Sequence, residues 1–127
     1  MREILFKAKT ISGNWVNGLL SNKDDKWYIS NKAGMPFAYD VLPETICQFT
    51  GLYDKNGKKI WENDILMAHL DESYPEDVAY ETVEWGVAGW VTHEAGCTDR
   101  EYLDEFDLEH FEVVGNIFDN PELLQEE

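Results

Sequence analysis

The sequence predicts one mainly β domain, built as an antiparallel meander or a small barrel over residues 1–127. Apolar and polar residues alternate over short runs, which is the pattern of strands with one buried face. Brief turns rich in Gly, Asn and Asp separate these runs. The chain has 127 residues, of which 43% are hydrophobic and 13% aromatic. It is therefore long enough for a single domain with its own core, and it shows no internal repeat or Pro/Ser-rich linker.

The first third of the chain reads as four short strands. Alternation in the first of them places Ile4, Phe6 and Ala8 on one face. Polar or Gly-containing turns separate each strand from the next, as in an antiparallel sheet. The predicted strands are residues 3–9, 15–20, 27–29 and 37–42, and the predicted turns are residues 13–14, 21–26 and 32–34.

The clearest hairpin is central, with strands at residues 50–53 and 58–61. Asp54 suits the first position of its turn, Asn56 the third, and Gly57 supplies a positive φ at the fourth. The same residues resemble the start of a calcium loop, which needs oxygen ligands at positions one, three and five and Gly at position six. Lysines occupy positions five and six here, so we predict a turn and no calcium site.

The second half of the chain continues with strands and adds two short helices. Thr98 and Glu101 form a candidate capping box for a helix that extends to Phe106. Asn120 and Pro121 suit the start of a short C-terminal helix. The predicted strands are residues 65–70, 78–85, 90–93 and 111–118, with turns at residues 62–64 and 86–89 and an exposed acidic loop that contains Asp71, Glu72, Glu76 and Asp77.

Charge is distributed unevenly along the chain. The sequence has 26 acidic and 10 basic residues, a formal net charge of −16. Residues 1–63 carry nine of the bases and seven acids, whereas residues 64–127 carry only Arg100 against 19 acids. Such a chain is repelled by phosphate backbones and by anionic membranes. We expect no direct binding to duplex DNA and no membrane association, and the acids either attract a basic partner or only keep the protein soluble.

The candidate catalytic and metal-binding residues form no recognisable motif. Cys47 and Cys97 lie far apart and neither belongs to a CxxC pair. His93, Glu94 and Cys97 are neighbours in sequence but are too few for structural zinc. A nucleophilic Cys–His pair would need spatial adjacency that a sequence does not show. We therefore predict no catalytic, metal-binding or cofactor-binding residues; the histidines that lack ligand spacing are His69, His93 and His110.

Two further expectations concern compartment and tryptophan burial. Residues 1–7 lack the apolar segment of a signal peptide, and no apolar run approaches the ~18 residues of a membrane span. We expect a cytoplasmic protein in which both thiols are reduced and buried. Most tryptophans should lie in the core, although small barrels also bind peptides on exposed aromatic grooves. The five are Trp15, Trp27, Trp61, Trp85 and Trp90.

Three segments carry longer motifs. The first is ILFKA at residues 4–8, followed by GNWVNG at residues 13–18. The second and most specific is PETICQFTGL at residues 43–52, continued by DKNGKKIWENDI at residues 54–65. The third is VVGNIFDNPELL at residues 113–124. Together these segments resemble the YopX family of small phage and prophage proteins, and the intervening residues 66–110 are less distinctive.

The resemblance implies a mainly β, SH3-like barrel of short antiparallel strands with one or two short helices, encoded by a phage-derived gene. It implies no catalytic residues, and the motif positions look like fold determinants. Asn63 stands where Gly is commoner in the family; Asn also tolerates a left-handed backbone, so we expect the turn to persist.

These observations favour a non-enzymatic protein-interaction module. Its protein partner is of unknown identity, and a basic partner would be attracted by the acidic half of the chain. Two alternatives remain open. One is an acidic mimic of nucleic acid that occupies a basic DNA-binding site on a host protein. The other is a hydrolase or metal-dependent enzyme whose site is assembled from separated residues, for example His93 with Cys97. The sequence leaves homo-oligomers open as well.

Overall fold

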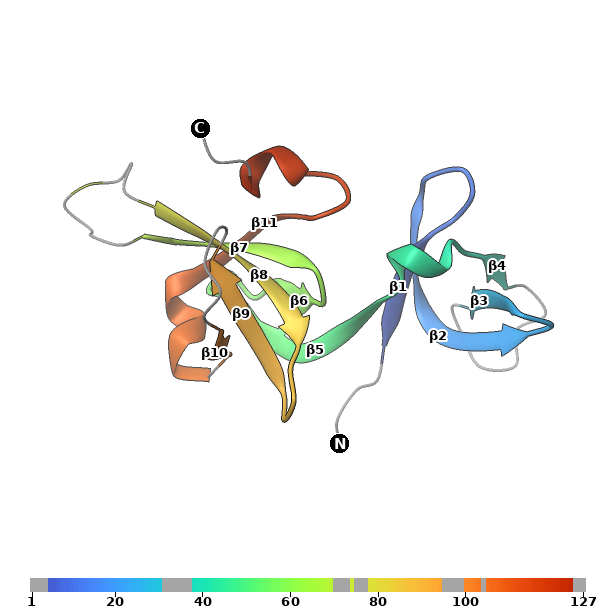
Figure 1. The fold of residues 1–127 in the computed structure, drawn as a ribbon, viewed down its shortest axis with the longest axis horizontal. Helices are drawn as coiled ribbons and strands as arrows, with labels where there is room; N and C mark the ends of the chain where they lie inside the picture. The colour runs from blue at the N-terminus through green and yellow to red at the C-terminus, as the bar shows by residue number, and fades with distance from the viewer. Residues whose placement is uncertain are drawn as a thin grey trace. The chain divides into compact units, whose positions relative to one another are not determined.

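The computed structural model describes residues 5–30, 38–69, 74, 78–94, 100–103 and 105–124, without the side chains of residues 105–107. The chain divides into two compact units, Met1–Gly51 and Leu52–Glu127, and each is described by itself. The hydrogen-bonded strand orders are β4-β3-β2-β1-β5-β6 and β10-β9-β8-β7-β11 (Figure 1). The mainly β prediction is confirmed. The barrel is not, because the strands form two sheets that each end in edge strands. A single domain over residues 1–127 stays a prediction.

Unit 1 is an antiparallel sheet with one buried face. Residues on one face form its core, where Ala8, Ile29 and Val41 are buried and Phe6 packs against them. The predicted inward face of the first strand is confirmed for Phe6 and Ala8. The elements are β1 (Phe6–Lys9), β2 (Trp15–Lys23), β3 (Lys26–Ser30), β4 (Tyr39–Asp40), the 3-10 helix η1 (Pro43–Thr45) and the first part of β5 (Cys47–Tyr53).

The β2–β3 hairpin is longer than predicted. Strand β2 continues to Lys23, which pairs with Lys26, so the expected turn over residues 21–26 is wrong in its extent. Asp24 and Asp25 alone make the turn, with φ of 54° and 64°. Two consecutive positive φ values are typical of the tight hairpin turn whose twist matches the flanking strands, and Asp tolerates this conformation.

Unit 2 carries the larger core. Leu66, Val83 and Trp90 are buried together with Ile60 and Val113. Partly buried Leu52, Leu103, Leu108 and Phe111 pack against this cluster. The elements that follow β5 are β6 (Lys59–Trp61), β7 (Asp64–His69), β8 (Val78–Trp85), β9 (Trp90–Glu94), β10 (Glu101–Tyr102), η2 (Glu105–His110), β11 (Phe111–Asn116) and η3 (Pro121–Leu124).

The helix predicted from Thr98 to Phe106 is wrong over Glu101 and Tyr102. These two residues form β10, which pairs with Thr92 and Val91 of β9. Hydrogen bonding to the open edge of β9 therefore overrides the local capping pattern. Among the described residues of this segment, helical turns begin at residue 105, as the 3-10 helix η2, and the C-terminal helix is also of the 3-10 type. No α-helix occurs in the described parts of the chain, and none of the helices there is long and apolar enough to cross a membrane.

Several predictions fall on residues outside the described ranges. These are the first part of the opening strand, the turn at residues 32–34, the acidic loop with Asp71, Glu72, Glu76 and Asp77, and the positions of Cys97 and Thr98.

The central hairpin turn is organised by Asp54, which is only 6% exposed. Its Oδ1 accepts hydrogen bonds from the backbone N–H groups of Asn56 (2.9 Å) and Lys58 (2.8 Å), and its Oδ2 accepts one from Val113 (2.9 Å). Burial by itself raises the pKa of Asp54, but these three donors and the Lys58 ammonium outweigh it and hold the pKa below its ordinary value. Gly57 has a φ of 79°, so the predicted turn is confirmed.

The second turn joins β6 to β7. Oδ2 of the buried Asp64 accepts the backbone N–H of Trp61 at 2.8 Å. Asn63 has a φ of 69°, which confirms that Asn keeps the left-handed backbone at this position. The Asn63 N–H donates to the Val83 carbonyl at 2.7 Å, and its carbonyl accepts from Ile117 at 3.0 Å. The turn is thereby bonded to β8 and to the segment after β11.

The C-terminal turn between β11 and η3 is closed by two asparagines. Oδ1 of Asn116 accepts the N–H groups of Phe118 (3.0 Å) and Asp119 (2.9 Å). Oδ1 of Asn120 accepts the Asn116 N–H at 3.2 Å. A Cβ on Gly115 would lie 2.3 Å from that Oδ1 and 2.9 Å from the Asn120 Cβ. Only glycine lets the Asn120 side chain approach this closely.

Candidate functional site

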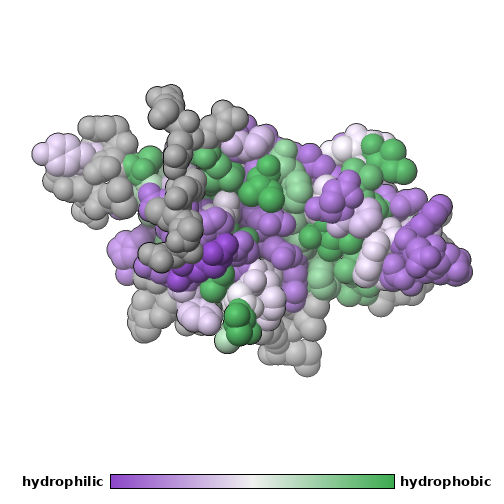
Figure 2. Space-filling view, in the orientation of Figure 1, coloured by the Kyte–Doolittle hydropathy of each residue, from purple (hydrophilic) through white to green (hydrophobic). Residues whose placement is uncertain are grey.

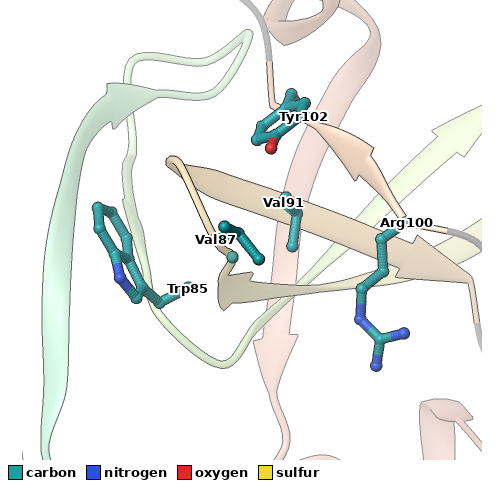
Figure 3. Close-up of a pocket in the computed structure, with 6 residues that line it drawn as sticks. Trp85, Val87, Val91, Arg100 and Tyr102 are labelled. Atoms are coloured by element: carbon teal, nitrogen blue, oxygen red, sulfur yellow. The ribbon is translucent and has the colours of Figure 1, made fainter.

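The candidate site is a hollow at the end of the β8–β9 hairpin in unit 2. Its volume is about 460 Å³. Figure 3 shows the Trp85 indole and the Arg100 side chain at opposite ends, with Val87 and Val91 between them. The lining residues are Trp85, Gly86, Val87, Val91, Arg100 and Tyr102.

Large apolar side chains of this hollow face solvent. Trp85 is 58% exposed, Tyr102 is 60% exposed, and Val87 is fully exposed. Trp90 pairs directly with Trp85 across the hairpin and is only 6% exposed. The two indoles meet edge to face, with centroids 4.8 Å apart and planes at 72°. The expectation that most tryptophans are core is met by Trp61 and Trp90 and in part by Trp27, which is half-buried against the unit 1 core. Trp15 is half-buried and Trp85 is exposed.

The backbone of the hairpin keeps the hollow open. Gly86 donates its N–H to the Gly89 carbonyl at 2.7 Å, which closes the turn. A Cβ on Gly86 would lie 2.8 Å from Cγ1 of Val91, so no side chain can project from this position. Tyr102 pairs with Val91 in the sheet and its ring passes about 4 Å from the place of a Gly89 Cβ. The lack of side chains at Gly86 and Gly89 therefore leaves room for Val91 and for the Tyr102 ring beside the turn.

A polar cluster borders the hollow on the same face of the sheet. Oε1 of Glu84 accepts a hydrogen bond from Nε of Arg100 and lies 3.4 Å from Nδ1 of His93. Oγ1 of Thr82 lies 3.1 Å from the same His93 nitrogen. A second hollow of about 390 Å³ lies beside this cluster and is lined by Asn63, Thr82, Val83, Glu84, His93, Ile117 and Leu124.

This cluster does not have the geometry of a nucleophilic triad. A triad places the carboxylate on one imidazole nitrogen and the hydroxyl on the other. Here Glu84 and Thr82 both contact Nδ1 of His93. The carboxylate and the hydroxyl are therefore not on opposite nitrogens of the imidazole ring, as a triad requires. The Cys47 thiol, in unit 1, is 1% exposed and donates to the Thr45 carbonyl at 3.3 Å, as expected for a buried thiol. Cys97, the other candidate partner of His93, lies outside the described residues.

No group of three or more potential metal ligands occurs within the described ranges. Sequence reasoning assigned no site residues, and it named neither the hollow nor its aromatic pair. A signal was present in the turn at residues 86–89, where Val87 and Ala88 are apolar although a solvent-exposed turn normally carries polar residues. No sequence pattern indicated that Tyr102 lies beside this turn, because its position depends on the pairing of β10 with β9.

Comparison with known proteins identifies the family. A family model described as YopX protein matches residues 6–125. The chain belongs to the YopX family. The three turns described above lie within the second and third motif segments, at residues 54–65 and 113–124, whereas the hollow lies within the less distinctive residues 66–110. None of the curated proteins compared with the chain matches it.

A crystal structure of protein EF1440 from Enterococcus faecalis shares the fold of this YopX chain. The TM-score is 0.63 with 21% sequence identity, and the match covers 98% of this chain and 100% of that one. At this identity the likeness extends to the fold alone.

Proposed function

We propose that the protein is a phage- or prophage-derived, non-enzymatic protein-interaction module that acts in the cytoplasm and holds its partner at the hollow of unit 2. The observation that carries the proposal is the exposure of Trp85 and Tyr102 around that hollow. Trp, Tyr and Arg are the residues that dominate the energetics of protein interfaces. All three line this one hollow. An apolar side chain of a partner would remove the two rings from water.

The charge of unit 2 favours a basic partner. Residues 52–127 contain 21 acids and four bases, a net charge of −17, whereas residues 1–51 contain five acids and six bases, a net charge of +1. Arg100, the base among the described lining residues, is already paired with Glu84. The partner segment therefore combines an apolar anchor residue with flanking Lys or Arg, whose attraction to the acids accelerates association.

The two alternatives receive less support. An acidic mimic of nucleic acid would use carboxylates across its contact surface and would gain nothing from two exposed aromatic rings. A hydrolase would need a positioned nucleophile, and Thr82 contacts the same imidazole nitrogen as Glu84. The interaction module accounts for the hollow, the aromatic pair and the charge together.

Site-specific photocrosslinking tests this function. A benzophenone amino acid replaces Val87, which is fully exposed in the hollow, or Ile11, which is 76% exposed in unit 1. Cells in which the phage genes are expressed are irradiated, and crosslinked peptides are sequenced. We expect adducts from position 87 to one basic protein segment and none to that segment from position 11.

The captured segment, made as a peptide, then gives the decisive measurement. Trp85→Ala should weaken its binding about 30-fold, the effect of truncating an interface anchor worth ~2 kcal/mol. Tyr39→Ala, which removes a 45% exposed ring in unit 1, should leave the affinity unchanged. A partner that crosslinks equally from both positions, or whose binding ignores Trp85 and falls only when acids are neutralised, would contradict the hollow and favour nucleic-acid mimicry.

A further inference from the structure

The two hollows of unit 2 are spaced along strand β9. Val91 lines the first hollow, of about 460 Å³, and His93 lines the second, of about 390 Å³. These residues are two positions apart in the strand, so their side chains point to the same face of the sheet, about 7 Å apart. Their partners in β8 are Glu84 and Thr82, which both line the second hollow. The hollows are therefore neighbouring sites on one face.

The two sites differ in their chemistry. Large apolar side chains are exposed around the first hollow, and Figure 2 shows hydrophobic surface at the end of the β8–β9 hairpin beside hydrophilic surface. The second hollow combines apolar and polar groups. Its apolar lining residues are Val83, Ile117 and Leu124, and its polar ones are Asn63, Thr82, Glu84 and His93. A side chain with an apolar stem and a polar head matches this mixture.

Glu84 supplies the charge of the second hollow. Its Oε1 accepts a hydrogen bond from Arg100 and lies 3.4 Å from Nδ1 of His93. Among the described residues, both contacts of this carboxylate are made by Oε1, which leaves Oε2 for an incoming donor. An arginine fork uses both oxygens of a carboxylate, whereas a lysine ammonium directs three donors to separate acceptors. Oγ1 of Thr82, 3.1 Å from the same imidazole nitrogen, is such a second acceptor, so the site favours lysine.

We propose that the partner segment is extended and carries a lysine two residues from its apolar anchor, with the anchor in the first hollow and the lysine in the second. Side chains two positions apart in an extended chain lie on the same side, about 7 Å apart. This repeat matches the spacing of Val91 and His93. The net charge of −17 on residues 52–127 also favours a base there. The inference rests on the function proposed above and supplies the partner chemistry that it leaves open.

Selection from a library of random peptides of about 12 residues, long enough to span both hollows, tests the inference. The library is displayed on bacteriophage and selected in parallel on the wild type, on Glu84→Gln and on Trp85→Ala. The wild type should enrich lysine two positions from an apolar residue, in preference to arginine and to a spacing of one or three. Glu84→Gln should keep the apolar residue and lose the lysine. Trp85→Ala should enrich neither.

A peptide selected on the wild type then gives a double-mutant cycle. Gln in place of its lysine should weaken binding about 10-fold, the effect of one hydrogen bond between charged groups. Glu84→Gln should weaken binding of the lysine peptide equally and that of the Gln peptide no further. The matched control is Glu94→Gln, which removes the same charge from an exposed residue next to His93, on the opposite face of β9. It should change the affinity less than twofold, and circular dichroism verifies that each variant is folded.

Failure of this inference is distinguishable from failure of the proposed function. Selected peptides that require Trp85 but lack lysine at that spacing, or that accept arginine equally, would overturn the inference and leave the proposed function intact. Equal losses from Glu84→Gln and Glu94→Gln, or additive losses in the cycle, would do the same. Peptides that bind Trp85→Ala as tightly as the wild type, or no enrichment at all, would overturn both.

Discussion

The three turns of the YopX motifs and the end of the β8–β9 hairpin use their residues in different ways. In the turns, the side chains of Asp54, Asp64 and Asn116 each accept backbone N–H groups. At the hairpin end, Trp85, Val87 and Tyr102 turn apolar surface toward solvent. The turn residues stabilise the fold, because a buried backbone group without a partner is costly. The hairpin residues gain little stability where they are, and their exposed apolar surface is the basis of the binding role proposed above.

Among the turn residues, the largest loss of stability is expected from Asp54→Asn. Its carboxylate accepts three backbone N–H groups, and an amide would turn one NH₂ toward a donor. We expect a decrease of about 3 kcal/mol in the free energy of unfolding at pH 7, measured by urea denaturation. Asp40→Asn, which changes an exposed carboxylate in unit 1, is the control and should have almost no effect.

The loss of stability caused by Asp54→Asn should also depend on pH. Because the folded pKa of Asp54 lies below its unfolded value of about 3.9, its stabilisation is complete above that pH. It is lost as the pH falls through the lower folded pKa. The difference between wild type and Asp54→Asn should therefore shrink below about pH 4. A difference that stays constant down to pH 2 would mean that the charge is not what holds the turn.

The next largest effect is expected from Gly115→Ala. The added Cβ would collide with Asn120, and we expect a loss of about 2 kcal/mol from overpacking. The double variant with Asn120→Ala removes the collision. If the collision is the cause, the double variant should lose less than the sum of the two single variants. Strict additivity in urea denaturation would show that the close approach is not responsible.

A loss of similar size is expected from Gly57→Val. A Cβ at Gly57 would meet no atom within 4 Å, so the whole cost arises from the φ of 79°. We expect about 2 kcal/mol for the β-branched residue and less than half of that for Gly57→Asn, which tolerates the left-handed region. Thermal melting compares the two variants, and equal midpoints would show that the backbone conformation is not decisive.

The smallest effect is expected from Tyr102→Ala. The ring is 60% exposed, so its removal should change the free energy of unfolding by less than about 0.5 kcal/mol. Trp90→Ala, in the buried core of the same sheet, should cost about 4 kcal/mol. Urea denaturation of both variants measures the contrast. A large loss from Tyr102→Ala would mean that this ring supports the hairpin and is not held in reserve for a partner.

Much of the fold could be predicted from the sequence because its local signals agree with its contacts. Positive φ at Gly57 and Asn63 follows from residue type, and alternation placed Phe6 and Ala8 in the core. The predictions were wrong where long-range strand pairing determines the secondary structure. Local capping could not reveal that Glu101 and Tyr102 pair with β9, and the polar residues 21–23 gave no sign that β2 continues.

The candidate site was harder to predict than the fold. Alternation assigned Trp85 to the same face as Val83, and Val83 is indeed buried. Trp85 nevertheless ends the strand, and 58% of its surface is exposed there. Exposure at the end of a strand depends on what packs there, and a residue pattern carries no information on that.

The bond from Val113 to Asp54 has a consequence for synthesis on the ribosome. It joins residues 59 positions apart, and β11 pairs with β7 in the sheet of unit 2. The chain leaves the ribosome from its N-terminus, so the turn at Asp54 emerges well before the strand that satisfies its second carboxylate oxygen. Contacts of such long sequence separation form late and slowly. Until residue 113 is available, the nascent unit 2 exposes an unpaired edge of β7 and the core residue Leu66, and it is then most vulnerable to aggregation and to proteases.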